Sequence, residues 1–179
     1  LPDPVCGESG PMPDTSIPMD ADAMRSTLTD VAQELGPHGP QHTVVIVGGA
    51  HLALTGIRES TVDIDSITLL DDELKSAIKS VALNRGIQLN WLNDDARGFT
   101  PATFELRECE VVFDSDRLRV LAAPMRQVFV MKLYRSNARD FEDMTAIWSR
   151  CNFDSPREVV ELFYEAYPHA PDDEFLEDF

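Results

Sequence analysis

The chain has 179 residues, 43% of them hydrophobic, and a formal net charge of −17 at pH 7. This length and apolar content predict one globular domain with a sizeable core and exclude a largely disordered chain. A surface this acidic repels nucleic acid at long range, so a DNA or RNA partner would need a local basic patch.

The predicted elements, in chain order, are helices interspersed with short strands. Residues 1–18 are rich in Pro and Gly and are expected to be disordered. Apolar periodicity, β-branched runs and Gly or Pro stops then predict helices at 19–35, 50–54, 71–85, 125–134, 138–149 and 156–167, and strands at 43–47, 61–70, 87–92, 109–113 and 117–122. Residues 93–100 are expected to form a polar loop.

This order of elements predicts an α+β fold: a small mixed β-sheet with helices packed on one side, followed by C-terminal helices. We expect a core at 19–123, a C-terminal helical part at 124–168 and an acidic tail at 169–179. The tail interleaves aromatic and acidic residues and is expected to be mobile.

Cysteine usage and hydropathy indicate the compartment. The three cysteines are odd in number and far apart, which argues against a zinc site or a disulfide framework and fits a reducing cytosol. No apolar run approaches the roughly 20 residues of a membrane span, and the N-terminus lacks the pattern of a signal peptide. We therefore expect a cytoplasmic protein without a membrane partner.

Two carboxylates separated by one residue, Asp63 and Asp65, lie in the second predicted strand. Residues two apart in a strand point to the same side, so these side chains are expected to converge, with Ile64 buried behind them. Adjacent like charges are costly unless a cation lies between them, and a divalent metal is the natural candidate. Gly48 and Gly49, between an apolar strand and a helix, add a backbone site of phosphate size. Without these glycines, two solvated carboxylates at a strand end would be the better interpretation.

Lys132 stands in an otherwise apolar helical stretch. It is either a lysine that extends its ammonium group from a half-buried helix to solvent, or a fixed cation directed at a phosphate or a carboxylate cluster. Arg139, Asp140 and Asp143 follow it. Arg139 and Asp143 are predicted to pair at i, i+4, either as a charged seam that docks the helix or as part of a site.

These segments resemble the DNA-polymerase-β-type nucleotidyltransferases. The residues that carry the resemblance are Gly48, Gly49, Arg58, Ser60, Thr61, Asp63, Asp65, Lys132, Arg139, Asp140 and Asp143. Within this superfamily the chain looks most similar to the AbiEii/MenT-type bacterial toxins. The resemblance covers residues 43–150 and rests on the order and spacing of the segments.

The resemblance implies a magnesium-dependent nucleotidyltransferase with its core at 19–123. Asp63 and Asp65 would hold two Mg²⁺ ions, with Mn²⁺ as a substitute, and Lys132 would contact a triphosphate. The residues implied to bind the NTP, ATP among the candidates, are Gly48, Gly49, Arg58, Ser60, Thr61 and Lys132. An acceptor hydroxyl would attack in line and release pyrophosphate, with positioning and electrostatics as the main catalytic contributions.

One position departs from the family pattern, which places a third carboxylate on a later strand. On the third predicted strand the inward polar residue is expected to be Asn90, which cannot act as a base. Asp94, Asp95 and Asp114 are the candidates to replace that carboxylate. The alternative is a catalytically weak or inactive module that binds nucleotide or a partner.

The resemblance also implies an acceptor: the 3′ end of tRNA, with the protein as the toxin of a toxin–antitoxin pair and a cognate antitoxin as partner. A tRNA acceptor requires arginines gathered on one face, and the candidates are Arg97, Arg107, Arg117, Arg119 and Arg126. If these are scattered, a protein side chain or a small hydroxyl compound is the better acceptor.

Overall fold

The computed structural model describes residues 16–174 and 176–178, so most of the segment 1–18, predicted to be disordered, lies outside the described residues. The helices are α1 (Ala21–Glu34), α2 (Gly48–Leu54), α3 (Asp72–Arg85), α4 (Met125–Arg135), α5 (Ala138–Cys151) and α6 (Pro156–Ala166). The strands are β1 (His42–Val47), β2 (Ile64–Ser66), β3 (Leu92–Asn93), β4 (Glu110–Asp114) and β5 (Leu118–Ala122). Two 3₁₀ turns, η1 (Asp95–Phe99) and η2 (Leu106–Glu108), lie between β3 and β4.

The strands form one mixed sheet in the order β3-β2-β1-β5-β4, which confirms the predicted α+β class. The central strand β1 runs parallel to β5 and antiparallel to β2. The predicted strands 109–113 and 117–122 correspond to β4 and β5, which pair as an antiparallel hairpin, and β3 pairs with β2 in parallel at the other edge.

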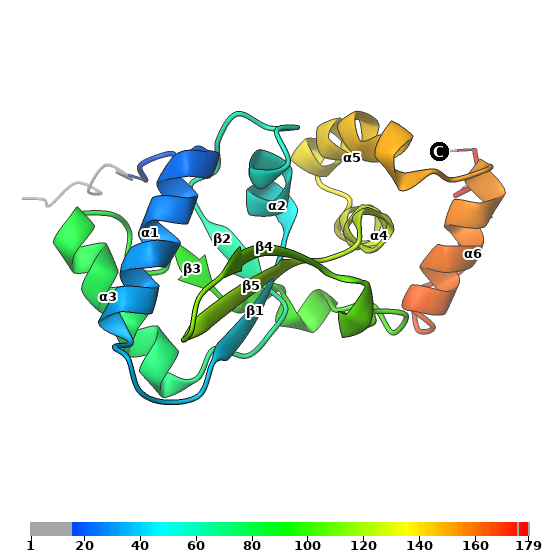
Figure 1. Ribbon diagram of the computed structural model, residues 1–179. Helices are drawn as coiled ribbons and strands as arrows, with labels where there is room; N and C mark the ends of the chain where they lie inside the picture. The colour runs from blue at the N-terminus through cyan, green and yellow to red at the C-terminus, as the bar shows by residue number, and fades with distance from the viewer. Residues whose placement is uncertain (1–15, 175, 179) are drawn as a thin grey trace, which may run out of the picture.

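Helices cover both faces of this sheet (Figure 1). Along β1, Val44 and Ile46 pack into a core with α1 and α3, whereas Val45 and Val47 pack into a second core with α4, α5 and α6. A strand segment covered on both faces has no position for a polar side chain, which explains the apolar run at 44–47. The expectation of helices on one side only is therefore wrong, because the C-terminal helices cover the second face.

Short polar side chains and glycine set the helix ends that the sequence predicts. Asp71 caps α3 by accepting a hydrogen bond from the Leu74 N–H at 2.9 Å, and Gly86 ends this helix with a left-handed φ of 65°. Asn137 and Asp140 form a capping box at the start of α5. The predicted helices at 71–85 and 138–149 are confirmed with small shifts at their ends.

Two predicted strands are much shorter than expected. Instead of 61–70, β2 covers three residues, because the Ser66 hydroxyl accepts a hydrogen bond from the Thr68 N–H at 3.0 Å and turns the chain locally. Instead of 87–92, β3 covers two residues, because the Trp91 N–H bonds to the Gln88 carbonyl at 3.2 Å and closes a turn. The predicted loop 93–100 contains the 3₁₀ turn η1.

The described part of the acidic tail lies against the C-terminal helices. Ala170 and Leu176 pack on their core, and the Asp173 N–H donates to the Tyr164 hydroxyl at 2.8 Å. Among the described residues, no helix combines the length and the apolar character that crossing a membrane requires.

The buried guanidinium of Arg117 holds the connection between α1 and β1. Only 3% of this residue is exposed, and it donates to the carbonyls of Leu35 at 2.5 Å and Pro40 at 3.0 Å and to Glu73 at 2.8 Å. Gly39 has a φ of +124°, and a Cβ there would lie 2.6 Å from the Arg117 Nη2. The connection therefore needs glycine at 39 and a planar, multiply donating cation at 117.

We expect Arg117→Ala to lower the free energy of unfolding by about 1–3 kcal/mol for each buried carbonyl that loses its donor. Arg119→Ala is the matched control, because Arg119 forms an exposed pair with Asp114 at 2.9 Å and should cost less than about 1 kcal/mol. Urea unfolding of both variants measures the difference. Equal losses would contradict the anchoring role of Arg117.

Candidate functional site

The central strand β1 ends at two glycines that neighbouring side chains approach closely. Gly48 has a left-handed φ of +64°, and a Cβ on it would lie 3.5 Å from the Asp65 Oδ2. A Cβ on Gly49 would lie 2.6 Å from the Arg58 Nη1 and 2.8 Å from the Thr61 Oγ1. Residues far apart in the sequence therefore meet at this turn, and a side chain at Gly49 would separate them.

The two predicted carboxylates lie beside this turn, but not on one strand. Asp65 is in β2, opposite Val47 of β1, whereas Asp63 precedes β2 and accepts a hydrogen bond from the Thr61 Oγ1 at 3.3 Å. Burial and then the negative charge of Asp63 raise the pKa of Asp65, while a hydrogen bond from Asn93 opposes the shift. The ionised form of Asp65 is therefore disfavoured unless a cation is present.

The polar residue beside Asp65 on β3 is Asn93, and the assignment of this position to Asn90 is wrong. Asn93 is the register partner of Asp65, and its Nδ2 donates to the Asp65 Oδ1 at 3.2 Å. Asn90 lies in the exposed turn before β3, because that strand starts later than predicted. The Asn93 Oδ1 also accepts from the Asp95 N–H at 3.0 Å and so joins β3 to η1.

The three replacement carboxylates lie in different places. Asp95 lines the same cavity as Asp65. Asp94 accepts from the Leu70 N–H at 3.2 Å and pairs with Lys75 at 3.4 Å. Burial alone would raise the pKa of Asp94, but these two contacts outweigh it and hold the pKa below its usual value.

Asp114 lies on β4, at the sheet edge opposite β3. It pairs there with Arg119 at 2.9 Å and accepts a hydrogen bond from Gln41 at 3.0 Å. The two carboxylates Asp94 and Asp114 therefore have structural contacts outside the cavity, and Asp95 is the one that faces it.

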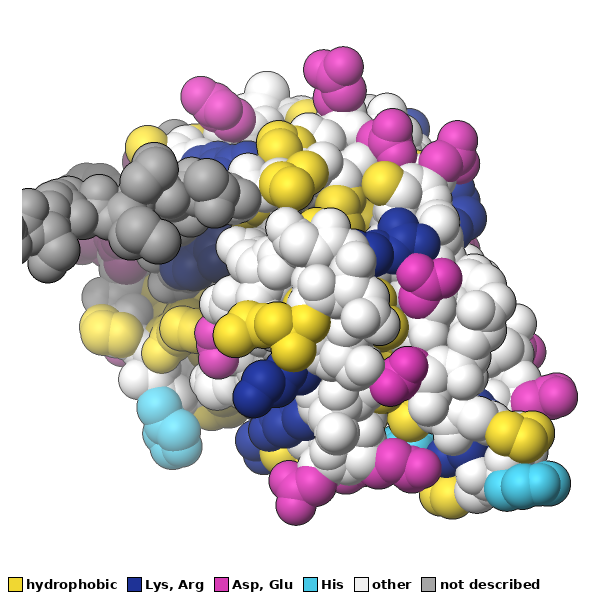
Figure 2. Space-filling view, turned by 90° about the vertical axis from the view of Figure 1, so that its left-hand side faces the viewer, with side chains coloured by type: hydrophobic (Ala, Val, Ile, Leu, Met, Phe, Trp, Pro, Cys, Tyr) yellow, Lys and Arg dark blue, Asp and Glu magenta, His cyan; other side chains and the backbone are white. Residues whose placement is uncertain are grey.

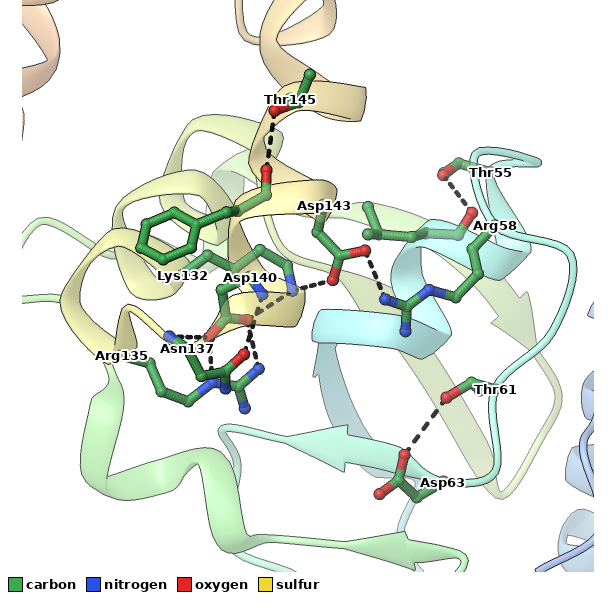
Figure 3. A network of polar contacts seen from close by, with 12 residues as sticks. Thr55, Arg58, Thr61, Asp63, Lys132, Arg135, Asn137, Asp140, Asp143 and Thr145 are labelled. Atoms are coloured by element: carbon green, nitrogen blue, oxygen red, sulfur yellow. Dashed lines mark hydrogen bonds and ion pairs between the residues drawn. The ribbon is translucent and has the colours of Figure 1, made fainter. Parts of the chain in front are cut away.

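Lys132 is at the centre of a buried ion network (Figure 3). Only 3% of this residue is exposed, and its Nζ lies 2.6 Å from Asp143 and 3.2 Å from Asp140. Asp143 also pairs with Arg58 at 2.5 Å, and Asp140 pairs with Arg135 at 2.6 Å. The interpretation of Lys132 as a lysine that extends to solvent is wrong, because its ammonium group is buried between Asp140 and Asp143, while its contact with a phosphate stays a prediction. We call these five residues the ion network.

The Asp140 carboxylate is held in its charged form. Burial alone would raise the pKa of Asp140, but the hydrogen bond from Arg135 and the charge of Lys132 outweigh it and keep the pKa below its usual value. With three cations and two carboxylates, the network carries one net positive charge.

Arg139 does not take part in this network. It is exposed at the start of α5, and Asp143 pairs with Arg58 and Lys132 instead, so the predicted i, i+4 pair of Arg139 with Asp143 is wrong. Helix α5 turns its carboxylates inward, towards cations from α4 and from the segment after α2.

Ser60, which the sequence also placed among the site residues, is half-buried next to Thr61.

A cavity of about 120 Å³ lies between the end of β1, η1 and α4. Its polar wall is formed by Gly48, Asp65, Asp95, Lys132 and Arg135. Carboxylates from the sheet side and cations from α4 therefore face one space. Residues predicted from separate parts of the sequence meet here.

The carboxylates fit a magnesium ion that arrives with a phosphate ligand. Among the described residues, no group of three or more His, Cys, Asp or Glu side chains could hold a metal. Mg²⁺ is typically bound by one or two carboxylates together with substrate phosphates rather than by an all-protein cage. Asp63 and Asp65 would supply those carboxylates, and a cation beside Asp65 would offset the raised pKa of its carboxyl.

Comparison with known proteins gives one match. Residues 25–174 match the family DUF6036, described as a nucleotidyltransferase of unknown function. The searches of curated proteins and of solved structures found no match, so the narrower resemblance to AbiEii/MenT-type toxins stays a prediction. The match covers far more than half of the chain, and the protein therefore belongs to the DUF6036 family of nucleotidyltransferases.

Proposed function

We propose that the protein is a magnesium-dependent nucleotidyltransferase that moves a nucleotide from an NTP to an acceptor hydroxyl and releases pyrophosphate. The observation that carries this proposal is the meeting of Asp65 with the paired glycines beside a cavity that Lys132 and Arg135 also line, with the charge of Asp63 acting on Asp65. Family membership supports the reaction class.

The triphosphate side of the site would be the glycine turn. Gly48 and Gly49 leave the backbone open to close approach, and Arg58, Ser60 and Thr61 supply a guanidinium and two hydroxyl groups next to it. The Thr61 hydroxyl already lies 3.3 Å from the Asp63 Oδ1, so the hydroxyl and the carboxylate can serve neighbouring groups of one ligand.

The metal would be held by Asp63 and Asp65, and when bound it would neutralise charge that develops on the phosphates. Asn93 fixes the orientation of Asp65 by donating to its Oδ1 at 3.2 Å. The remaining oxygen of Asp65 faces the Gly48 backbone, where a Cβ would come within 3.5 Å of it.

The ion network would supply the positive potential for a triphosphate. Its net charge is positive, and Lys132 and Arg135 line the cavity. Lys132 is almost fully buried, so solvent screens the electrostatic effect of its charge only weakly. Lys132 is thus both a member of the buried network and the proposed cation for the triphosphate.

The acceptor proton needs a base, and of the three candidates Asp94, Asp95 and Asp114 it is Asp95 that lines the cavity, together with Asp65. Its backbone N–H is held by the Asn93 side chain at 3.0 Å, which places it beside Asp65. The presence of Asp95 favours an active enzyme over the alternative of a nucleotide-binding module without turnover.

The acceptor is better sought among small hydroxyl compounds and protein side chains than in tRNA. Of the candidate arginines, Arg117 is buried, Arg119 pairs with Asp114 and Arg126 pairs with Glu158. On the face in Figure 2, basic side chains form small groups between acidic ones. A toxin role with a cognate antitoxin rests on the sequence resemblance alone.

We expect transfer of label from at least one α-labelled NTP in the presence of Mg²⁺, tested with total tRNA, protein extract and small hydroxyl compounds as acceptors. Asp63→Ala and Asp65→Ala should reduce transfer by at least about 100-fold, as the removal of groups that stabilise transition-state charge typically does. If label is transferred to none of these acceptors, the proposed nucleotidyltransferase activity is refuted and the alternative of a binding module without turnover remains.

We also expect Asp65→Asn to be more stable than the wild type at neutral pH without metal. The pKa of Asp65 is raised in the folded state, so its charge costs stability at neutral pH, and this cost disappears as the pH falls through the raised value. Asparagine carries no such cost, but it cannot replace the carboxylate as a ligand.

Thermal unfolding with and without Mg²⁺ and NTP measures both effects. The ligands should raise the midpoint of the wild type and have little effect on Asp65→Asn. Asp94→Asn is the control, because Asp94 pairs with Lys75 away from the cavity and should keep the ligand effect. An equal ligand effect in Asp65→Asn would exclude Asp65 from the metal site.

A further inference from the structure

The lining of the cavity also has an apolar part, which includes one aromatic ring. Its apolar residues are Val47, Ala96, Phe99, Val128 and Met131, and all but the first come from η1 and α4, which also supply charged ones. Phe99 is 39% exposed, although it belongs to the large apolar residues that usually contribute to a core. An exposed ring therefore borders a cavity that carboxylates and cations share.

The C-terminal helices hold this ring in place. The Tyr167 hydroxyl, at the end of α6, donates to the Phe99 carbonyl at 2.7 Å, and the Ala102 N–H donates to the Ala166 carbonyl at 2.8 Å. These contacts fix the backbone of η1 and of the segment after it to α6. The position of the Phe99 ring is therefore set by the fold and not by a free loop.

Two further rings stand behind Phe99. Its ring lies edge-to-face with Tyr134, at 6.4 Å between centroids and 61° between planes. Tyr134 in turn stacks on Tyr167 at 4.1 Å and 14°, while 43% of Tyr134 stays exposed. Together Phe99 and Tyr134 present an aromatic surface that is rigid and still accessible.

The size of the cavity suits one planar ring. Its volume is about 120 Å³, close to the about 150 Å³ of an apolar cavity that binds benzene and well below the about 300 Å³ at which sites for whole drug-sized ligands start. The cavity is therefore of the size of a part of a nucleotide and not of the whole. A ring placed against Phe99 would leave the sugar and phosphates to extend toward the charged lining residues.

We propose that Phe99, backed by Tyr134, is the stacking surface for the nucleobase of the NTP. This proposal rests on the proposed nucleotidyl transfer and adds the residue that binds the base. Aromatic stacking accepts every base, because each has a π-face. The affinity for an NTP should therefore contain a contribution from Phe99 that inorganic tripolyphosphate, which lacks a base, does not use.

The test is calorimetric titration of the full chain with each of the four NTPs and with tripolyphosphate, in the presence of Mg²⁺. Phe99→Ala should weaken binding of the best NTP by roughly 5- to 150-fold, the range for loss of one stacked base, and leave tripolyphosphate binding unchanged. Phe99→Tyr should retain NTP affinity, because the ring remains. The hydrogen bond of Tyr167 is to the backbone of residue 99, so both variants keep it.

Trp148→Ala is the matched control, because Trp148 is an aromatic residue of similar exposure, 40%, that lines a different groove on α5. It should bind the NTP and tripolyphosphate as the wild type does. If Phe99→Ala does not fold, Phe99→Leu keeps the apolar contacts while removing the ring and gives the same comparison.

The outcomes separate the two proposals. Unchanged NTP affinity in Phe99→Ala, or an equal loss for NTP and tripolyphosphate, overturns the stacking surface and leaves the nucleotidyl transfer standing. A variant that binds NTP normally but has a raised KM for the acceptor assigns the ring to the acceptor and also overturns it. A wild-type protein that binds no NTP overturns the nucleotidyl transfer and the stacking surface together.

Discussion

The buried ion network is the constraint on which the arrangement of this molecule depends. Arg58 lies in the segment between α2 and β2, whereas Lys132 belongs to α4 and the two carboxylates belong to α5 (Figure 3). Removing one member of such a network typically costs about 3–5 kcal/mol, because the partners remain buried and charged. The network thus holds the C-terminal helices against the glycine turn, and the same contacts direct its cations to the cavity.

Much of the fold could be predicted from the sequence, because strong local signals agree with the tertiary structure. The capped helix after Asp71 and the apolar strand before Gly48 are examples. The short strands were missed, since β2 and β3 pair over only two or three residues and are set by neighbours rather than by periodicity. The second covered face of the sheet could have been inferred from β1, whose run of apolar residues leaves no solvent side.

The sequence identified many of the residues of the site, but it did not predict which of them contact one another. The order of Gly48, Asp65 and Lys132 indicated which residues to group, but the partners of Lys132 depend on how α5 rotates about its axis. Asn93 was missed because the third strand was placed too early, although it is the first polar residue after Trp91 and Leu92. Phe99 had no sequence signal, since its exposure comes from a 3₁₀ turn that α6 holds from a distance.

The opposing charges around the cavity have a thermodynamic consequence. Burial and the charge of Asp63 raise the pKa of Asp65, which makes its ionised form less favourable, and the network carries positive charge that favours an anion. A cation and a polyphosphate that bind side by side would each remove the penalty that the other meets, so their binding would be cooperative. Because coupling between ligands is reciprocal, the metal would increase the affinity for the nucleotide by the same factor as the nucleotide would increase that for the metal. A metal ion and a nucleotide that each bind weakly alone would in this way bind tightly when both are present.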